Sequence, residues 1–329
     1  MQTSVMIVKR IITAVLISLK SDAYQSSSCY SQAYTKKLNK FLWLTSRHDI
    51  PSRSTYFMSN VYTDDIIDTS QTHRPAVVIV AGATGYIGKA VVEQSIHRHF
   101  TTIGLVRDKE LLNTPEKKRL YGKTFYQAHL LQASVSNTTE LQESISTFLT
   151  CHAIHSSTHN LYFVSCLASP VGTRREAYAI DYQATLNFLH VAQSIHAYHF
   201  CLLSAFCVRR PLLQLQQAKL KMEAEIQNQT QLNDRNNIPS WSIIRPTAFL
   251  KSISGQLESI QRGNSYVVFG DGAVTKCNPI SQQDLAEFMF MIMMDPKKHN
   301  QIYNIGGPDN PLTPKMLGEV RDMCTKIYE

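Results

Sequence analysis

Short runs of apolar residues alternate with longer amphipathic segments from residue 76 onwards. The runs that predict strands buried on both faces cover residues 76–82, 101–107, 123–128, 160–168, 199–205 and 241–246. The segments with helical periodicity between them cover residues 86–98, 139–149, 176–195 and 211–226. Regular alternation of this kind predicts an α/β fold, a doubly wound parallel sheet of the Rossmann type with right-handed crossovers.

Beyond residue 247 the alternation is looser. Residues 263–272 predict a small hairpin or strand, residues 281–295 an amphipathic helix capped by Ser281, and residues 301–307 a late strand. The methionines of the helix favour core filling over a ligand surface. We therefore expect a Rossmann domain over residues 76–246 and a smaller C-terminal portion over residues 247–329.

The first 75 residues have the composition of a targeting sequence. Lys9 and Arg10 precede a short apolar run that suits a signal-peptide core, and Ala23 suits a cleavage site. Residues 24–62 are rich in Ser, Thr and basic residues and contain one acid, Asp49, as transit peptides do. Together they resemble the bipartite presequence (signal about 1–23, transit about 24–75, largely disordered) of proteins bound for a complex secondary plastid. A mitochondrial presequence or a plain disordered extension is the alternative.

Charge and cysteine content exclude several classes of function. The net charge of +8 divides evenly, because nine basic and five acidic residues precede residue 76, and 24 and 20 follow. A balance this modest, without a basic stripe, argues against nucleic acid as a partner. None of the seven cysteines forms a Cys-x-x-Cys pair, so we expect neither a zinc nor an iron–sulfur site and no other metal.

A glycine-rich motif, AGATGYIG, ends the first predicted strand and opens the first predicted helix. Glycines at this spacing allow a tight turn, a close approach of the backbone to a pyrophosphate, and close packing of helix on strand. The helix N-terminus then faces the phosphates with free N–H groups. The residues expected to bind a dinucleotide are Gly82, Thr84, Gly85, Tyr86, Ile87 and Gly88. A glycine-rich turn in a domain that has lost its cofactor is the alternative.

Arg107 stands at the end of the second predicted strand, where an NAD-binding domain places a carboxylate for the ribose. A guanidinium at this point can pair with a 2′-phosphate, and Lys109 lies nearby in support. The sequence therefore favours NADPH over NADH, with an ordinary solvated loop charge as the alternative for Arg107.

Several longer stretches resemble a known family. The glycine motif, VSCLAS at 164–169, LLSA at 202–205 and the helix that carries Lys219 resemble the atypical short-chain dehydrogenase/reductase superfamily, NmrA-like members included. PLLQLQQAKLKMEAEI at 211–226 and IIRPTAFLKSISGQ at 243–256 look like the NADPH-dependent, plastid-type divinyl chlorophyllide a 8-vinyl-reductases. The resemblance covers roughly residues 77–318. It implies an oxidoreductase of chlorophyll biosynthesis that reduces the 8-vinyl group of divinyl chlorophyllide or protochlorophyllide to ethyl, with residues 247–329 binding the substrate.

Leu215 occupies the position of the superfamily's catalytic tyrosine, four residues before Lys219. Carbonyl reduction develops charge on an oxygen, so a positioned acid assists it. A vinyl group has no such oxygen, and the conjugated macrocycle can accept the developing charge, so loss of the tyrosine fits a carbon–carbon double bond. The resemblance assigns Lys219 to the ribose hydroxyls of the nicotinamide half; a surface lysine is the alternative.

Further site positions follow from the resemblance. Ala168 and Pro246 follow strands beside the nicotinamide, and Ser204 is either a site hydroxyl or a strand-end cap. Asp181 and Tyr182 are the candidates to relay the proton, with a structural role as the alternative.

Two departures from the family also stand out. His129 occupies the place expected for an aspartate after the third strand, and the family extends some tens of residues further, so we expect a C-terminally truncated substrate portion.

Two other interpretations stay open. A non-enzymatic NADP(H)-binding regulator or assembly subunit of the same superfamily would also lack the tyrosine. An isoflavone-reductase-like enzyme would reduce a small molecule instead of a macrocycle. The region that discriminates is 245–280, because a reductase of a macrocycle needs a wide apolar cleft there and a regulator does not. Peripheral association with thylakoid or envelope membranes and the oligomeric state are left open by the sequence.

Overall fold

The computed structural model describes residues 74–229, 238–252, 265–268, 270–308 and 310–316. The described residues divide into two compact units, a larger one within residues 74–251 and 279–307 and a smaller one within residues 252–278 and 308–316. The predicted presequence lies outside the described residues, apart from its last two positions.

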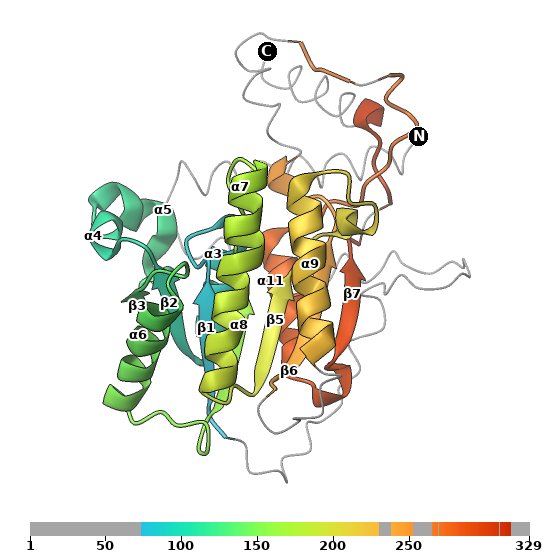
Figure 1. The fold of residues 1–329 in the computed structure, drawn as a ribbon. Coiled ribbons are helices and arrows are strands. Elements are labelled where there is room, and N and C mark those ends of the chain that lie inside the picture. Colours follow the sequence, from blue (N-terminus) through green and yellow to red (C-terminus); the bar gives the residue numbers. More distant parts are fainter. Residues whose placement is uncertain (1–73, 230–237, 253–264, 269, 309, 317–329) are drawn as a thin grey trace. The chain divides into compact units, whose positions relative to one another are not determined.

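The larger unit contains seven parallel strands in the order β3-β2-β1-β4-β5-β6-β7 (Figure 1). The strands are β1 (Ala76–Ala81), β2 (Thr101–Val106), β3 (His129–Gln132), β4 (Asn160–Ser165), β5 (His199–Leu203), β6 (Ser240–Pro246) and β7 (Gln301–Ile305). The predicted Rossmann-type parallel sheet is therefore confirmed. Because β4 returns to the side of β1, the carboxyl ends of these two strands form the switch point at which such sheets bind ligands.

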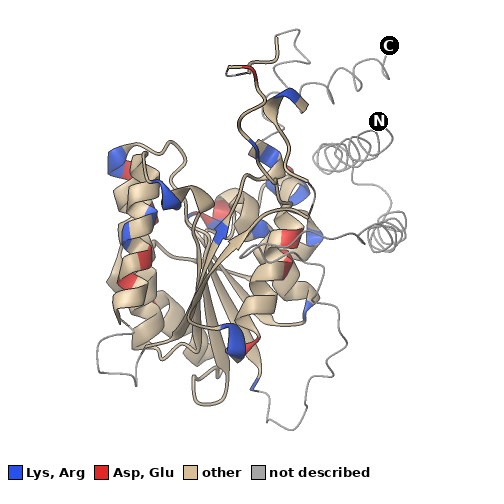
Figure 2. Cartoon of the chain, turned by 90° about the vertical axis from the view of Figure 1, so that its right-hand side faces the viewer, with Lys and Arg blue, Asp and Glu red and all other residues tan. Residues whose placement is uncertain are grey.

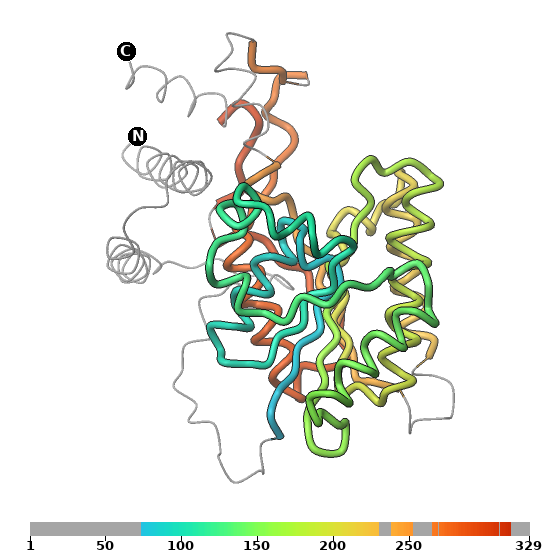
Figure 3. The backbone as a smooth tube through the Cα atoms, turned by 90° about the vertical axis from the view of Figure 1, so that its left-hand side faces the viewer, coloured from blue at the N-terminus to red at the C-terminus, as the bar shows by residue number. Residues whose placement is uncertain are grey.

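Helices cover both faces of the sheet, as Figure 3 shows edge-on. One layer consists of α3 (Tyr86–His97), α5 (Pro115–Phe125) and α11 (Gln282–Met293), and the other of α6 (Thr138–Cys151), α8 (Thr185–Ser194) and α9 (Gln214–Gln229). Shorter helical segments are α4 (Lys109–Leu112), α7 (Arg174–Glu176), the π-helix η2 (Ala177–Ala184), η3 (Phe206–Arg209) and η4 (Pro296–Lys298).

The main apolar core lies between the sheet and the α6–α8–α9 layer. Alternate residues of the central strands, such as Ile79, Phe163 and Phe200, pack against Phe188 of α8 and Met222 of α9. Cys166 and Cys201 are buried, as expected of small core residues, and burial raises the pKa of both thiols, that of Cys201 to about 12. These cysteines therefore stay protonated and act as packing residues.

The strand predicted at residues 123–128 is wrong. Pro115 at the first helical position and the Thr114 side chain, which accepts from the Lys117 N–H, start helix α5 instead. The third strand begins only at His129, so this residue stands at the start of β3 and not after its end. His129 therefore does not occupy the place at which an aspartate was expected.

The elements expected late in the chain are present. The Ser281 hydroxyl caps α11 by accepting from the Asp284 N–H at 3.0 Å, and Met289 and Met293 are fully buried. Helix α11 packs on α3, and β7 pairs with β6 as the last strand of the sheet. The larger unit thus takes in two elements that follow Pro246.

The described part of the smaller unit is a set of turns held by backbone bonds. Cys277 and Leu312 exchange N–H···O bonds of 2.9 and 2.8 Å, and the Lys315 N–H donates to the Gly272 oxygen at 3.0 Å. Among its described residues the predicted hairpin at 263–272 contains no strand. Its use as a substrate-binding portion stays a prediction.

Charged residues of both signs are distributed over the helices of the larger unit, as Figure 2 shows. In the described part of the chain, no helix is both long and apolar enough to cross a membrane.

Two histidines lie together at the amino-terminal edge of the sheet: His199, which is buried at the start of β5, and His299, which is half-buried just before β7. The Ser240 hydroxyl donates to the Tyr198 oxygen at 2.8 Å, so it accepts from Nδ1 of His199 at 2.9 Å, and Nε2 then accepts from the Ser242 hydroxyl at 2.8 Å. The His299 ring lies 4.0 Å from the His199 ring. Burial, and then the neighbouring histidine, lower the pKa of His199 well below its usual range, so the folded protein keeps this ring neutral.

We expect the free energy of unfolding to fall as the pH drops below the ordinary histidine pKa of about 6.5, because the unfolded chain then binds more protons. The slope should reach at most about 1.4 kcal/mol per pH unit for each such histidine. Urea unfolding of His199→Gln between pH 7.5 and 5 should show a smaller slope, whereas the exposed His155→Gln control should retain it. If the free energy of unfolding depends on pH equally in the wild type, His199→Gln and His155→Gln, the neutral state assigned to His199 is contradicted.

Candidate functional site

The glycine loop between β1 and α3 forms a cradle with no room for side chains. A Cβ at Gly82, where φ is +78°, would lie 2.7 Å from the Cys166 oxygen at the end of β4, and a Cβ at Gly88 would collide with the Gly82 oxygen. Gly85 caps α3 without a side-chain bond, and the first turn carries no acid. A helix N-terminus without an acidic side chain favours an anion, and the loop fits the pyrophosphate of a dinucleotide.

Arg107 lies where the sequence predicted it, directly after β2, and its side chain is exposed. The following residue, Asp108, caps α4 by accepting from the Leu111 N–H at 2.9 Å. The Asp108 carboxylate is therefore used in capping the helix. Two cationic side chains, Arg107 and Lys109, are left exposed after β2, where such folds bind the adenosine ribose.

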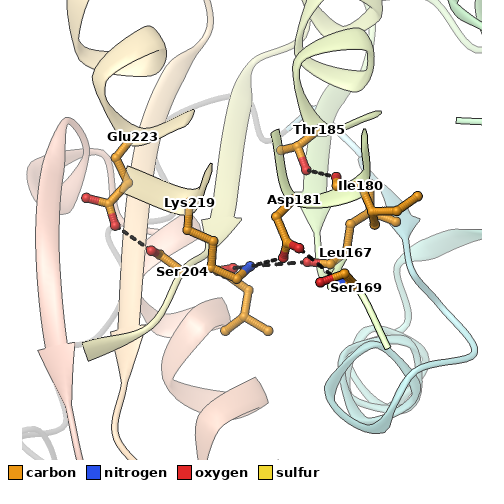
Figure 4. Close-up of polar contacts among 9 residues, drawn as sticks. Leu167, Ser169, Ile180, Asp181, Thr185, Ser204, Lys219 and Glu223 are labelled. Carbon is orange, nitrogen blue, oxygen red and sulfur yellow. Dashed lines mark hydrogen bonds and ion pairs between the residues drawn. The ribbon is translucent and has the colours of Figure 1, made fainter. Parts of the chain in front are cut away.

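Lys219 is not a surface residue. Its ammonium donates to the Leu167 oxygen at 3.3 Å and the Leu203 oxygen at 3.2 Å, and it lies 3.1 Å from Oδ1 of Asp181 (Figure 4). The Lys219 side chain is 8% exposed and that of Asp181 is fully buried. The surface alternative for Lys219 is thereby excluded, and one buried ammonium connects the ends of β4 and β5 with η2. Its predicted contact with ribose stays a prediction.

The π-helix η2 determines where Asp181 points. Thr185, which follows this segment, is bonded back to it, because its hydroxyl donates to the Ile180 oxygen at 3.2 Å (Figure 4). Oδ2 of Asp181 accepts from the Ser169 N–H at 3.1 Å, while Oδ1 faces Lys219 without a hydrogen-bond alignment. Asp181 thus holds both the lysine and the segment after β4.

A second buried carboxylate, Glu223, was missed by the sequence analysis. It lies one turn after Lys219 on α9 and accepts from the Ser204 hydroxyl and from Nε and Nη2 of Arg245 at the end of β6. The only signal for it was the i, i+4 spacing from Lys219, which puts both side chains on the same face of the helix. Ser204 hence serves at least as a link between strand β5 and helix α9.

The remaining predicted residues lie at different places. Ala168 is exposed after β4, beside Ser169, whose buried hydroxyl has no hydrogen-bond partner among the described residues. Pro246 is buried at the end of β6. The Tyr182 hydroxyl donates to Glu225 at 2.8 Å, and the Lys221 ammonium lies 4.0 Å from the centroid of its ring. Tyr182 is therefore bound to the flank of α9 and does not join the Lys219–Asp181 pair.

Taken together, the parallel sheet, the glycine cradle at its switch point and the exposed cation after β2 define a dinucleotide-binding α/β protein. The sequence model of the NAD(P)H-binding family matches residues 82–296, and the chain belongs to that family.

Comparison with solved structures confirms the fold. UDP-glucose 4-epimerase from Thermotoga maritima superposes with a TM-score of 0.59 at 15% identity, covering 76% of this chain and 82% of that one. Gre2 from Candida albicans, solved in complex with NADPH, gives a TM-score of 0.54 at 17% identity, covering 77% and 84%.

Curated relatives are more similar in sequence. Divinyl chlorophyllide a 8-vinyl-reductase of Arabidopsis thaliana, a chloroplastic protein, is 41% identical over 248 residues, covering 74% of this chain and 56% of that protein. The chloroplastic protein of the same name from Cucumis sativus is 39% identical over 243 residues, covering 74% and 55%. The chain spans about half the length of these relatives.

Replacement of Lys219 by methionine should destabilise the protein by about 3–5 kcal/mol, because it leaves the buried Asp181 carboxylate without its counter-charge. Lys219→Met combined with Asp181→Asn should recover most of the loss. Chemical unfolding at neutral pH measures both effects, and Lys221→Met, on the exposed side of the same helix, is the control. A loss no larger than that of the control would show that the ammonium and carboxylate are not paired in solution.

Proposed function

We propose that this protein is an NADPH-dependent oxidoreductase acting on a carbon–carbon double bond, the 8-vinyl group of divinyl chlorophyllide or protochlorophyllide, which it reduces to ethyl in chlorophyll biosynthesis. The observation that carries the proposal is the relatedness, at 36–41% identity over 74% of the chain, to curated proteins of that name. The substrate and the reaction come from those relatives, and the chain's own residues support the cofactor half of the proposal.

Different residues of the larger unit would bind different parts of NADPH. The glycine cradle would hold the pyrophosphate and Arg107 the 2′-phosphate, while the segment from Leu167 to Ser169, kept in place by Lys219 and Asp181, would border the nicotinamide. When bound, NADPH supplies the hydride. The chain's task is to orient the two reactants and to exclude water.

The neighbourhood of Lys219 suits a reaction in which no oxyanion forms. The half-buried Leu215 replaces the acid that a carbonyl reductase uses, and the positive charge of Lys219 is balanced by Asp181. A site without an acid and without a free cation gives little help to a developing alkoxide. The absence of these two groups does not hinder a reaction in which the conjugated substrate itself accepts the developing charge.

One observation favours the second candidate, a non-enzymatic NADP(H)-binding regulator or assembly subunit. The Lys219 ammonium already donates to two carbonyl oxygens, so at most one of its three hydrogens is left for a ribose hydroxyl. A regulator would bind NADPH with this loop and catalyse nothing. The two candidates therefore differ in turnover and not in cofactor binding.

The proposed location is a plastid, reached in the finer form of the proposal through a bipartite presequence into a complex secondary plastid. The relatives named above are chloroplastic, which supports the plastid. Peripheral membrane association is part of the same proposal. It is supported by two exposed leucines after η3, Leu212 (86% exposed) and Leu213 (61% exposed), which follow Arg209 and Arg210.

Purified protein mixed with NADPH and divinyl chlorophyllide should shift the Soret band of the pigment to the blue, as the 8-vinyl group leaves the conjugated system. The matched control is Gly88→Ala, which should abolish both cofactor binding and the shift because its Cβ collides with the Gly82 oxygen. If the protein binds NADPH but the Soret band does not shift, the reductase proposal is rejected and the non-enzymatic regulator is favoured. Absence of NADPH binding would reject both.

Arg107→Gln should lower the affinity for NADPH about 10- to 100-fold, the range expected for a lost charge-assisted hydrogen bond to the 2′-phosphate, and should leave the affinity for NADH unchanged. Titration of each cofactor by fluorescence measures both constants. Arg119→Gln, an exposed arginine on α5, serves as the control. An equal loss for both cofactors would mean that Arg107 does not read the 2′-phosphate.

A further inference from the structure

The side chain of Arg245 is held along one edge only. Its Nε lies 3.0 and 3.1 Å from the two oxygens of Glu223, and Nη2 donates to the same carboxylate. Glu223 is fully buried and Arg245 is 15% exposed. Among the described residues nothing accepts from Nη1, so neither of its two hydrogens has an acceptor in that part of the chain.

The charge of the guanidinium is already balanced. Glu223 lies in contact with Arg245 as Asp181 does with Lys219, so the four buried charges at this end of the sheet sum to zero. A second anion at Nη1 would therefore enter beside a buried carboxylate. A neutral acceptor oxygen would gain the hydrogen bond without that repulsion.

The position of Arg245 identifies which oxygen this would be. In a doubly wound sheet the glycine loop after β1 and the residue after β2 bind the pyrophosphate and the adenosine half. The nicotinamide half then lies over the ends of the second set of strands, β4, β5 and β6. Arg245 stands at the end of β6, and the Ser204 N–H donates to the Ile244 oxygen at 2.7 Å next to it.

We propose that Glu223 is a positioning residue, which fixes the Arg245 guanidinium so that its free Nη1 donates to the carbonyl oxygen of the nicotinamide carboxamide. This inference rests on the proposed NADPH binding and names residues that the glycine motif does not predict. Glu223 also takes the hydroxyl hydrogen of Ser204. It therefore fixes the ends of β5 and β6 together, and with them the angle at which the guanidinium faces the cofactor.

Three reduced cofactors separate the contact from general binding. The thionicotinamide analogue replaces the carbonyl oxygen by sulfur, a weak acceptor, whereas the acetylpyridine analogue keeps the oxygen and loses only the amino group. Calorimetric titration of the wild-type protein should show that the thionicotinamide analogue binds about tenfold more weakly than NADPH, with the acetylpyridine analogue close to NADPH. This comparison requires no variant and no turnover.

The double variant Glu223→Met with Arg245→Met removes both charges and keeps the volume, a replacement that buried ion pairs tolerate. It should bind NADPH about tenfold more weakly and bind the sulfur analogue as the wild type does, so that the discrimination disappears. Glu223→Gln retains the guanidinium without its counter-charge. Its NADPH binding should become more sensitive to chloride than that of the wild type at equal ionic strength, which a merely structural role would not cause.

Lys298→Met, at the opposite end of the sheet, is the control and should keep the wild-type discrimination. Equal binding of the oxygen and sulfur cofactors by the wild type would overturn the inference while leaving the proposed function intact. So would a folded double variant that still discriminates, or one that weakens only pigment binding. A wild-type protein that binds no NADPH at all would overturn the proposed function, and this inference with it.

Discussion

Helix α9 carries two opposite charges into the interior of the protein, and each is neutralised by a different part of the fold. Burying a single charge without a partner costs several kcal/mol, so α9 can dock only where Asp181 and Arg245 meet Lys219 and Glu223. Asp181 comes from η2 and Arg245 from β6, while the lysine also reaches the carbonyl ends of β4 and β5. The carboxyl edge of the sheet is thus held together by ionic contacts rather than by apolar packing alone.

This arrangement gives the site its chemical character. In the described residues around α9, the buried charged side chains form two ion pairs, Lys219–Asp181 and Arg245–Glu223. Leu215 stands where the superfamily has its tyrosine. The two ion pairs thus leave this end of the sheet with no net charge from these four side chains. Such a site stabilises a developing charge poorly, which matches hydride transfer to an extended conjugated system.

Patterns local in the sequence predicted most of the fold. The apolar runs and glycine spacing gave the strands and the cradle, because both depend on neighbours within a few residues. The strand predicted at 123–128 failed since Phe125 and Tyr126 suit a strand equally well, while the capping Thr114 and Pro115 decide for a helix. Glu223 was missed for the opposite reason. Its partner Arg245 lies 22 residues away, and no local pattern distinguishes a buried glutamate from an exposed one.

The π-helical turn in η2 makes the site sensitive to chain length as well as to residue identity. A π turn accommodates one more residue than an α-helix would, and the side chains that follow are rotated accordingly. Deleting a single residue between Ala177 and Ile180 would restore an ordinary α-helix and turn Asp181 about 100° away from Lys219. Neighbouring side chains can adjust to a substitution in this segment, but they cannot restore the direction of Asp181 after the deletion of a residue. The position of Asp181 therefore depends on the length of this segment as well as on its residue types.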